Sequence, residues 1–185
     1  MQVSQNDPKP EGFVVWMTGL PASGKSTLSK LLEAKLRDGH GRYVEVLDGD
    51  EVRKGLSHDL GLSKEDREEH ARRVSYVAKV LARNGVVAIV GLISPYRESR
   101  VQAREMVGPD RFVEVYVKAP LSLCEKRDPK GLYAKALRGE IDNMTGIQDP
   151  YEEPEDADIV VDTSEDTPQA SLKDLVAGLR SLGKL

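Results

Sequence analysis

The sequence has little cysteine and no long apolar run. Cys124 is its one cysteine, which excludes an internal disulfide and a cysteine-rich metal site and suits a structural thiol. No apolar stretch reaches the length of a membrane span, and the first residues do not form a secretory signal. We therefore expect a cytoplasmic protein without a membrane partner.

The sequence also lacks a strong excess of charge of either sign. It has 27 Lys and Arg against 31 Asp and Glu, and a net charge of −4. This balance argues against a nucleic-acid partner, which would need a basic face. An anionic substrate would need positive charge focused at one place. The 185 residues are enough for one domain with its own core.

The clearest motif is Gly19-Leu-Pro-Ala-Ser-Gly-Lys-Ser26, which fits the phosphate-binding loop G-x-x-x-x-G-K-[ST]. Its glycines let backbone N–H groups surround a polyphosphate, and the helix that follows adds its positive dipole end. Lys25 is expected to reach the β- and γ-phosphates, and Ser26 to bind Mg²⁺. The alternative is a plain glycine-rich turn. The predicted ATP contacts are Gly19, Leu20, Pro21, Ala22, Ser23, Gly24, Lys25, Ser26 and Thr27.

Apolar runs alternate with helical patterns along the chain, which predicts an α/β fold. The expected strands are 13–18, 43–47, 86–90, 112–117 and 159–161. The expected helices are 25–38 with Gly39 and Gly41 as stop signals, 63–83 behind a capping box at Ser63, 97–106, 121–126, and a last one capped by Thr167-Pro168. Residues 138–157 are expected to be loop. The prediction is a P-loop NTPase fold: a doubly wound, five-stranded parallel sheet with helices on both faces and a lid near 127–133. Residues 1–11 form a flexible N-terminal tail, and 12–185 one kinase domain.

Polar residues follow the second and third strands, where ligands bind in such sheets. Asp48 and Asp50 are the candidates for base and metal-shell groups. We favour Asp48 for the acceptor hydroxyl and Asp50 for Mg²⁺, with the reverse assignment and a simple Asp-Gly-Asp turn left open. Ser94 is interpreted as a binding hydroxyl rather than a covalent nucleophile, because no His or Lys flanks it.

Several basic residues are candidate anion clamps, since arginine binds phosphate or sulfate through a two-pronged fork. They are Arg53, Arg67, Arg97, Arg127 and Lys130, the last two in the lid. For each, the alternative is solvated surface charge. His70 is interpreted as a binding or structural residue rather than a proton shuttle.

These residues together resemble the adenylylsulfate (APS) kinase family, from about Trp16 to Tyr151. The motifs that carry the resemblance are Trp16-Met-Thr-Gly-Leu20, Leu47-Asp-Gly-Asp50 with Val52-Arg53, Asp59-Leu-Gly61, Asp66-Arg67, Arg72-Arg-Val74, Ile93-Ser-Pro-Tyr-Arg97, Cys124-Glu-Lys-Arg-Asp128, Lys130-Gly-Leu-Tyr133, Gly139-Glu-Ile141, Thr145-Gly-Ile147 and Pro150-Tyr-Glu152.

The resemblance implies that ATP phosphorylates the 3′-hydroxyl of adenosine 5′-phosphosulfate (APS), giving PAPS and ADP. It also implies Mg²⁺ and a homodimer, and we expect ATP sulfurylase as a separate chain. From the residues themselves we assign catalytic roles to Lys25, Asp48 and Asp50, and Mg²⁺ binding to Ser26 and Asp50. Ser94 is added as a catalytic site because the family describes a phosphoserine intermediate at the matching serine. The substrate contacts that the resemblance implies are Asp48, Arg53, Arg67, Ser94, Arg97, Lys130 and Ile147. The other predicted substrate contacts are Leu62, His70, Ile93, Gly131, Leu132, Met144, Thr145 and Gly146.

The chain departs from the family pattern on the acceptor side. Leu62 and Met144 stand where the family usually has two phenylalanines that sandwich the substrate adenine, and His70 stands where Asn is common. These changes keep two alternatives open. One is a P-loop kinase for another adenosine nucleotide or small hydroxyl compound. The other is a catalytically weak nucleotide-binding module that regulates sulfate activation.

Overall fold

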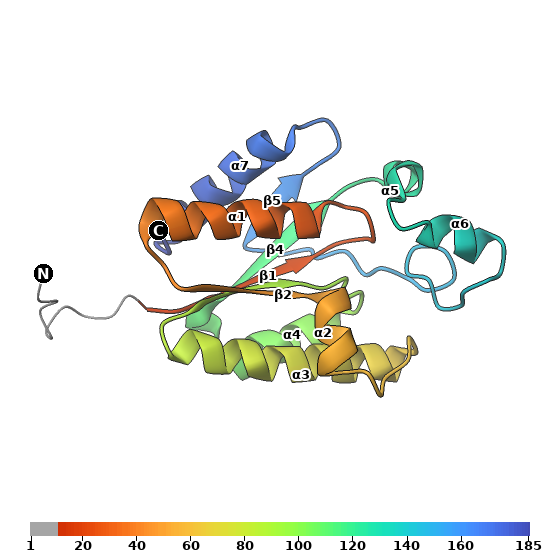
Figure 1. The fold of residues 1–185 in the computed structure, drawn as a ribbon, viewed down its shortest axis with the longest axis horizontal. Coiled ribbons are helices and arrows are strands. Elements are labelled where there is room, and N and C mark those ends of the chain that lie inside the picture. The colour runs from red at the N-terminus through yellow and green to blue at the C-terminus, as the bar shows by residue number, and fades with distance from the viewer. Residues whose placement is uncertain (1–10) are drawn as a thin grey trace, which may run out of the picture.

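In the computed structural model, which describes residues 11–185, five parallel strands form one sheet with helices on both faces (Figure 1). The strands follow the spatial order β2-β3-β1-β4-β5. All five predicted strands are confirmed to within about one residue. The predicted tail lies outside the described residues apart from Glu11. The strands are β1 (Val14–Thr18), β2 (Val44–Asp48), β3 (Val87–Gly91), β4 (Phe112–Lys118) and β5 (Ile159–Asp162).

The helices predicted from apolar spacing are confirmed, and two short α-helices and one 3₁₀ helix were missed. The helices are α1 (Lys25–His40), α2 (Gly49–Gly55), α3 (Lys64–Arg83), α4 (Arg97–Val107), η1 (Pro109–Arg111), α5 (Leu121–Arg127), α6 (Leu132–Leu137) and α7 (Pro168–Ser181). The missed α-helices are α2, which buries no residue, and α6, which has six residues and buries only Tyr133 and Ala136. The stop predicted at Gly39 is wrong, because α1 continues to His40 and Gly41 supplies the left-handed cap. In residues 11–185, no helix combines the length and apolarity needed to cross a membrane.

Side-chain caps fix where α3 and α7 begin. Ser63 Oγ accepts a hydrogen bond from the Asp66 N–H at 3.2 Å, and Thr167 Oγ1 accepts one from Ala170 at 3.2 Å. The capping box at Ser63 is only half formed. The Asp66 carboxylate accepts from the Gly61 N–H instead of returning to the cap residue, so it orders the loop before α3.

The core has two halves because alternate side chains of a strand point to opposite faces of the sheet. Val15 and Met17 of β1 pack on the side covered by α1 and α7, where Leu32 is buried. Val14 and Trp16 pack on the side covered by α3 and α4 (Figure 1). Both halves are closed to water, which explains the unbroken apolar runs of the strands.

A third apolar cluster lies under α5 and α6, at the end of the molecule that carries the lid (Figure 1). It contains Cys124, Tyr133 and Met144, all buried. Burial raises the pKa of the Cys124 thiol, which agrees with a structural rather than a reactive cysteine. The cluster gives the lid apolar support of its own.

A buried ion pair ties α4 to β4. Arg100 Nε donates to Glu114 Oε1 at 2.9 Å, and both side chains are almost inaccessible. The same guanidinium donates to the carbonyls of Ser94 and Glu152, each at 2.8 Å. Arg100 therefore links the end of β3 to the distant loop around residue 152.

We expect Glu114→Ala to lower the free energy of unfolding by about 3–5 kcal/mol, because it leaves the Arg100 guanidinium buried without its carboxylate. Denaturant unfolding followed by circular dichroism measures the change. Glu33→Ala is the control, since Glu33 pairs with the half-exposed Arg37 and should cost less than about 1 kcal/mol. Equal losses in the two variants would contradict the role of the buried pair.

Candidate active site

A single cleft of about 690 Å³ opens at the carboxyl ends of the strands. The phosphate loop, the ends of β2 and β3, the start of α3 and the lid all contribute to its lining. Ligands bind at this edge of an open parallel sheet, where the connections from two neighbouring strands leave in opposite directions. Here those strands are β1 and β3: the chain continues from β1 to β2 on one side of the sheet and from β3 to β4 on the other.

The phosphate loop has the backbone that its glycines predict. Gly24 precedes α1 with φ 112°, a left-handed conformation that suits glycine. Gly19 has no room for a side chain, since a Cβ there would lie 2.4 Å from the Val117 carbonyl oxygen. Ala22 also has positive φ, at 62°, so the loop holds one non-glycine residue under backbone strain.

Lys25 curls back over its own loop. Its Nζ donates to the carbonyls of Gly19 and Leu20, both at 2.7 Å. Burial lowers the pKa of this ammonium to about 8, since a desolvated site disfavours the charged form. At neutral pH most of the Lys25 side chains still carry their proton, and the charge lies at the floor of the cleft.

The two aspartates after β2 point to different partners. Ser26 Oγ donates to Asp48 Oδ2 at 2.7 Å, which joins the phosphate loop to the end of β2. Asp48 Oδ1 also accepts from the Asp50 N–H, as the cap of α2. The Asp50 carboxylate is exposed and pairs with Lys130 of the lid. Asp48 is thus the carboxylate nearest the predicted metal ligand Ser26.

Ser94 is buried at the end of β3 with an unusual backbone. Its φ of 44° is left-handed, a conformation that costs a non-glycine residue about 1–3 kcal/mol and concentrates at functional sites. Its hydroxyl accepts from Trp16 Nε1 at 3.1 Å. Within residues 11–185, the Ser94 hydroxyl makes no other hydrogen bond. No His or Lys of that part of the chain is therefore placed to activate Ser94 as a nucleophile. Next to it, the Ile93 carbonyl accepts from Thr18 Oγ1 at 2.7 Å.

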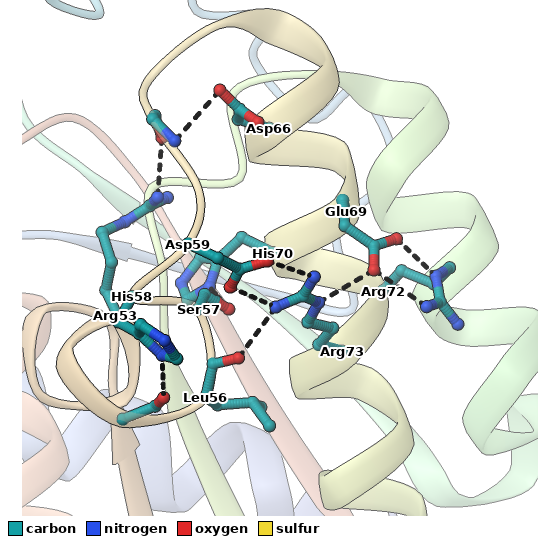
Figure 2. A network of polar contacts seen from close by, with 12 residues as sticks. Arg53, Leu56, Ser57, His58, Asp59, Asp66, Glu69, His70, Arg72 and Arg73 are labelled. Atoms are coloured by element: carbon teal, nitrogen blue, oxygen red, sulfur yellow. Dashed lines mark hydrogen bonds and ion pairs between the residues drawn. The ribbon is translucent and has the colours of Figure 1, made fainter.

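Two of the predicted clamps, Arg53 and Arg67, line the cleft and also brace its walls. Arg53 donates to the Gly61 carbonyl at 2.7 Å, as Figure 2 shows. Arg67 donates to the carbonyls of Leu62 at 3.0 Å and Asn143 at 2.7 Å. It therefore spans the two loops that carry Leu62 and Met144.

The two apolar residues of the cleft that replace the family's phenylalanines differ in exposure. Leu62 is 41% exposed and Met144 only 5%.

His70 lines the cleft from α3 and is held by Ser57, a residue that sequence reasoning missed. The two side chains contact through Nδ1 and Oγ at 2.9 Å (Figure 2). Burial, followed by the charges of Arg53, Arg73 and Arg67, lowers the pKa of His70 to about 4. The imidazole is neutral at physiological pH.

Side chains tie the lid to the phosphate loop. Tyr133 donates to the Pro21 carbonyl at 3.0 Å, and Arg127 donates to Thr163 Oγ1 at 3.2 Å. Thr163 in turn donates to the Ser23 carbonyl at 2.7 Å. Sequence reasoning assigned Tyr133 and Thr163 no role. Thr163 directly follows the fifth strand, and that position alone could have marked it as a site residue, because ligands bind at the carboxyl ends of the strands.

The structure does not bring every predicted residue to the cleft. The lining includes most of the phosphate loop from Pro21, together with Asp48, Asp50, Ile93, Ser94, Arg127, Lys130 and Leu132. Arg97 lies outside it and is engaged by Glu155 at 2.6 Å. The other predicted contacts that do not line it are Gly19, Leu20, Ser23, Gly131, Thr145, Gly146 and Ile147.

Comparison with known proteins agrees with this geometry. A family model described as adenylylsulphate kinase matches residues 11–162. A probable adenylyl-sulfate kinase of Pyrococcus abyssi is 53% identical over 175 residues, which cover 95% of this chain and 99% of that protein.

The structure of the Mycobacterium tuberculosis APS kinase CysC in complex with AMPPNP and APS matches with a TM-score of 0.88 and 44% identity, over 92% of this chain and 99% of that chain. The hexameric APS kinase from Thiobacillus denitrificans matches with a TM-score of 0.73 and 33% identity, over 98% of this chain and 31% of that chain. The chain belongs to the adenylylsulphate kinase family.

Proposed function

We infer that this chain transfers the γ-phosphoryl group of ATP to the 3′-hydroxyl of APS, giving PAPS and ADP. The observation that carries the proposal is the 2.7 Å contact between Ser26 Oγ and Asp48 Oδ2. It brings a metal-binding hydroxyl of the phosphate loop against a carboxylate able to act on an acceptor. Family membership supports the choice of acceptor, since the relative from M. tuberculosis is described as a complex with AMPPNP and APS.

On the donor side, we propose that the phosphate loop and Lys25 bind the triphosphate of ATP. Ser26 offers a hydroxyl, a kind of oxygen ligand that fits Mg²⁺, which otherwise keeps water and substrate phosphates. Asp50 is the carboxylate that we propose for its outer shell, and Asp48 is reserved for the acceptor. When bound, Mg²⁺ would neutralise charge on the β- and γ-phosphates. Lys25 supplies positive charge at the same place from the protein itself.

On the acceptor side, we propose Asp48 as the base. The 3′-hydroxyl gives its proton to the Asp48 carboxylate, the acceptor oxygen forms a bond to the γ-phosphorus, and the bond to the β-phosphate oxygen breaks to release ADP. Arg53, Arg67 and Lys130 are the cations that the cleft offers to the phosphosulfate. Ser94 would serve as a fixed polar contact, because its hydroxyl has no base beside it.

The second candidate function is phosphorylation of another adenosine nucleotide or small hydroxyl compound. The half-exposed Leu62 favours it, since that wall of the acceptor pocket lacks an aromatic ring. The regulatory-module alternative is weaker, because Lys25, Ser26 and Asp48 meet in one cleft. An assay of ADP release with ATP, Mg²⁺ and a panel of acceptors, APS among them, tests all three.

We also propose that residues 12–185 act as one kinase domain in a cytoplasmic homodimer. The hexameric relative supports self-association in this family, and size-exclusion chromatography with light scattering measures the state of this chain.

We expect Lys25→Ala to reduce transfer to near background, because charge on the γ-phosphate would develop without its ammonium partner. ADP release under saturating APS is the measurement. Lys35→Ala is the control, since Lys35 is an exposed residue on the same helix and should leave the rate unchanged. A near-normal kcat for Lys25→Ala would contradict the assignment of the phosphate loop.

We expect Asp48→Asn to lower kcat by about 10²–10⁴-fold with a much smaller change in KM for APS, since a base acts in the transition state. Asp50→Asn is the matched variant, two residues away and facing the lid. Steady-state kinetics at fixed Mg²⁺ compares them. If Asp50→Asn loses more kcat than Asp48→Asn, the two roles are reversed.

We expect Leu62→Phe to lower the Kd for APS by about three- to tenfold, because a ring stacks on adenine by about 0.5–1.5 kcal/mol more than an aliphatic side chain. Titration calorimetry of APS in the presence of ADP measures binding. Leu56→Phe is the control, since Leu56 is equally exposed but does not line the cleft. No gain in the first variant would mean that Leu62 does not contact the base.

A further inference from the structure

Ser57 and His70 form a pair that the proposed mechanism does not use. Ser57 follows α2 and is fully buried, while His70 lies on α3 with one edge on the cleft. Their contact of 2.9 Å joins Oγ to Nδ1 (Figure 2). One ring nitrogen is therefore committed to the protein, and Nε2 is the nitrogen left for a ligand.

The surroundings of Ser57 favour one tautomer of the His70 ring. The Ser57 hydroxyl is shielded from water, and Nδ1 is its one side-chain hydrogen-bond partner in residues 11–185. If Nδ1–H were the donor, the hydroxyl proton would have no side-chain acceptor, and a buried unmade hydrogen bond costs about 1–3 kcal/mol. We therefore take Ser57 as the donor and Nδ1 as the unprotonated acceptor. The neutral ring then carries its proton on Nε2.

The surrounding charges keep the ring neutral. Arg53 on α2, and Arg67 and Arg73 on α3, all disfavour a further positive charge, and burial acts in the same direction. Arg73 is itself fixed by Asp59 at 2.6 Å and by Glu69 at 2.8 Å, and it donates to the Leu56 carbonyl next to Ser57 (Figure 2). This network holds the loop that carries Ser57 against α3.

We propose that Ser57 is a positioning residue which locks His70 in the Nε2–H form, so that His70 donates a hydrogen bond to an uncharged acceptor atom of the phosphosulfate nucleotide. The inference rests on the proposed function. An anionic group would pair better with Arg53 or Arg67, which line the same cleft. A neutral donor is suited to a purine ring nitrogen or a ribose oxygen, and so makes His70 a determinant of nucleotide identity.

Nitrogen-15 NMR of the histidine rings tests the tautomer without any substrate. The protein has three histidines, and the other two, His40 and His58, are exposed and serve as reference signals. We expect His70 to show the Nε2–H pattern unchanged from about pH 5.5 to about pH 8. In Ser57→Ala the pattern should become a mixture of tautomers. An Nδ1–H ring in the wild type, or no change in Ser57→Ala, would overturn the proposal.

Kinetics tests the contact with the nucleotide. We expect His70→Ala to raise KM for APS about three- to tenfold, the worth of one hydrogen bond, while KM for ATP stays unchanged. Ser57→Ala should raise KM for APS in part, and His70→Asn, which keeps an N–H donor, should restore much of the loss. Ser75→Ala is the control, because Ser75 is equally buried on α3 but donates to the Arg72 carbonyl away from the cleft. An unchanged KM for APS in His70→Ala overturns the proposal.

APS analogues identify the acceptor atom. Each analogue replaces one purine nitrogen by carbon or removes the ribose 2′-hydroxyl, and each is measured with the wild type and with His70→Ala. The analogue that lacks the bonded atom should raise KM in the wild type and add nothing further in the variant. Losses that add for every analogue would overturn the contact. Failure of the proposed function itself would appear separately, as absence of ADP release with APS in the wild type.

Discussion

The constraint on which the rest of the structure depends is that all five strands run in the same direction. Every loop that leaves the carboxyl end of a strand must then emerge at one edge of the sheet. The phosphate loop after β1, Asp48 at the end of β2, Ser94 after β3 and Thr163 after β5 lie far apart in the sequence. The parallel sheet brings them to one cleft, and the 2.7 Å contact of Ser26 with Asp48 is its most direct result.

The cleft is lined by five cationic side chains and by five aspartates, so its positive charge is balanced by carboxylates. Two of the cations are already engaged with backbone carbonyls: Lys25 with Gly19 and Leu20, and Arg67 with Leu62 and Asn143. Binding of a polyphosphate by Lys25 therefore exchanges one set of hydrogen bonds for another. The net gain in binding free energy is the difference between a charge-assisted hydrogen bond from Lys25 to phosphate and a hydrogen bond from Lys25 to a neutral carbonyl.

The donor and acceptor sides of the cleft differ in how they are built. The donor side is made of backbone, with Gly19 packed too closely for any side chain. The side that we propose for the acceptor is made of side chains on α3 and on two loops, which Arg67 joins, and the Arg73 network supports the loop around residues 56–59. Leu62, Met144 and His70 all belong to this second side. Substitutions there can change which nucleotide fits without disturbing the phosphate loop.

The sequence by itself determined the fold class, all five strands and the long helices, because each depends on local apolar spacing or on a cap such as Ser63. It also determined the phosphate loop and the family. It missed α2 and α6, which are short and bury no residue or only two, and it placed a stop at Gly39, which α1 passes through. The reason is that short helices and helix ends are decided by contacts beyond the local window.

Only the tertiary structure decided which side chains meet. It set Asp48 rather than Asp50 against Ser26, directed Arg97 to Glu155 outside the cleft, and paired His70 with Ser57. Such pairings join residues of different elements, and the residue type gives no hint of the partner. Side-chain direction follows from how the elements pack, and packing is fixed by the burial of the whole sheet between its two layers of helices.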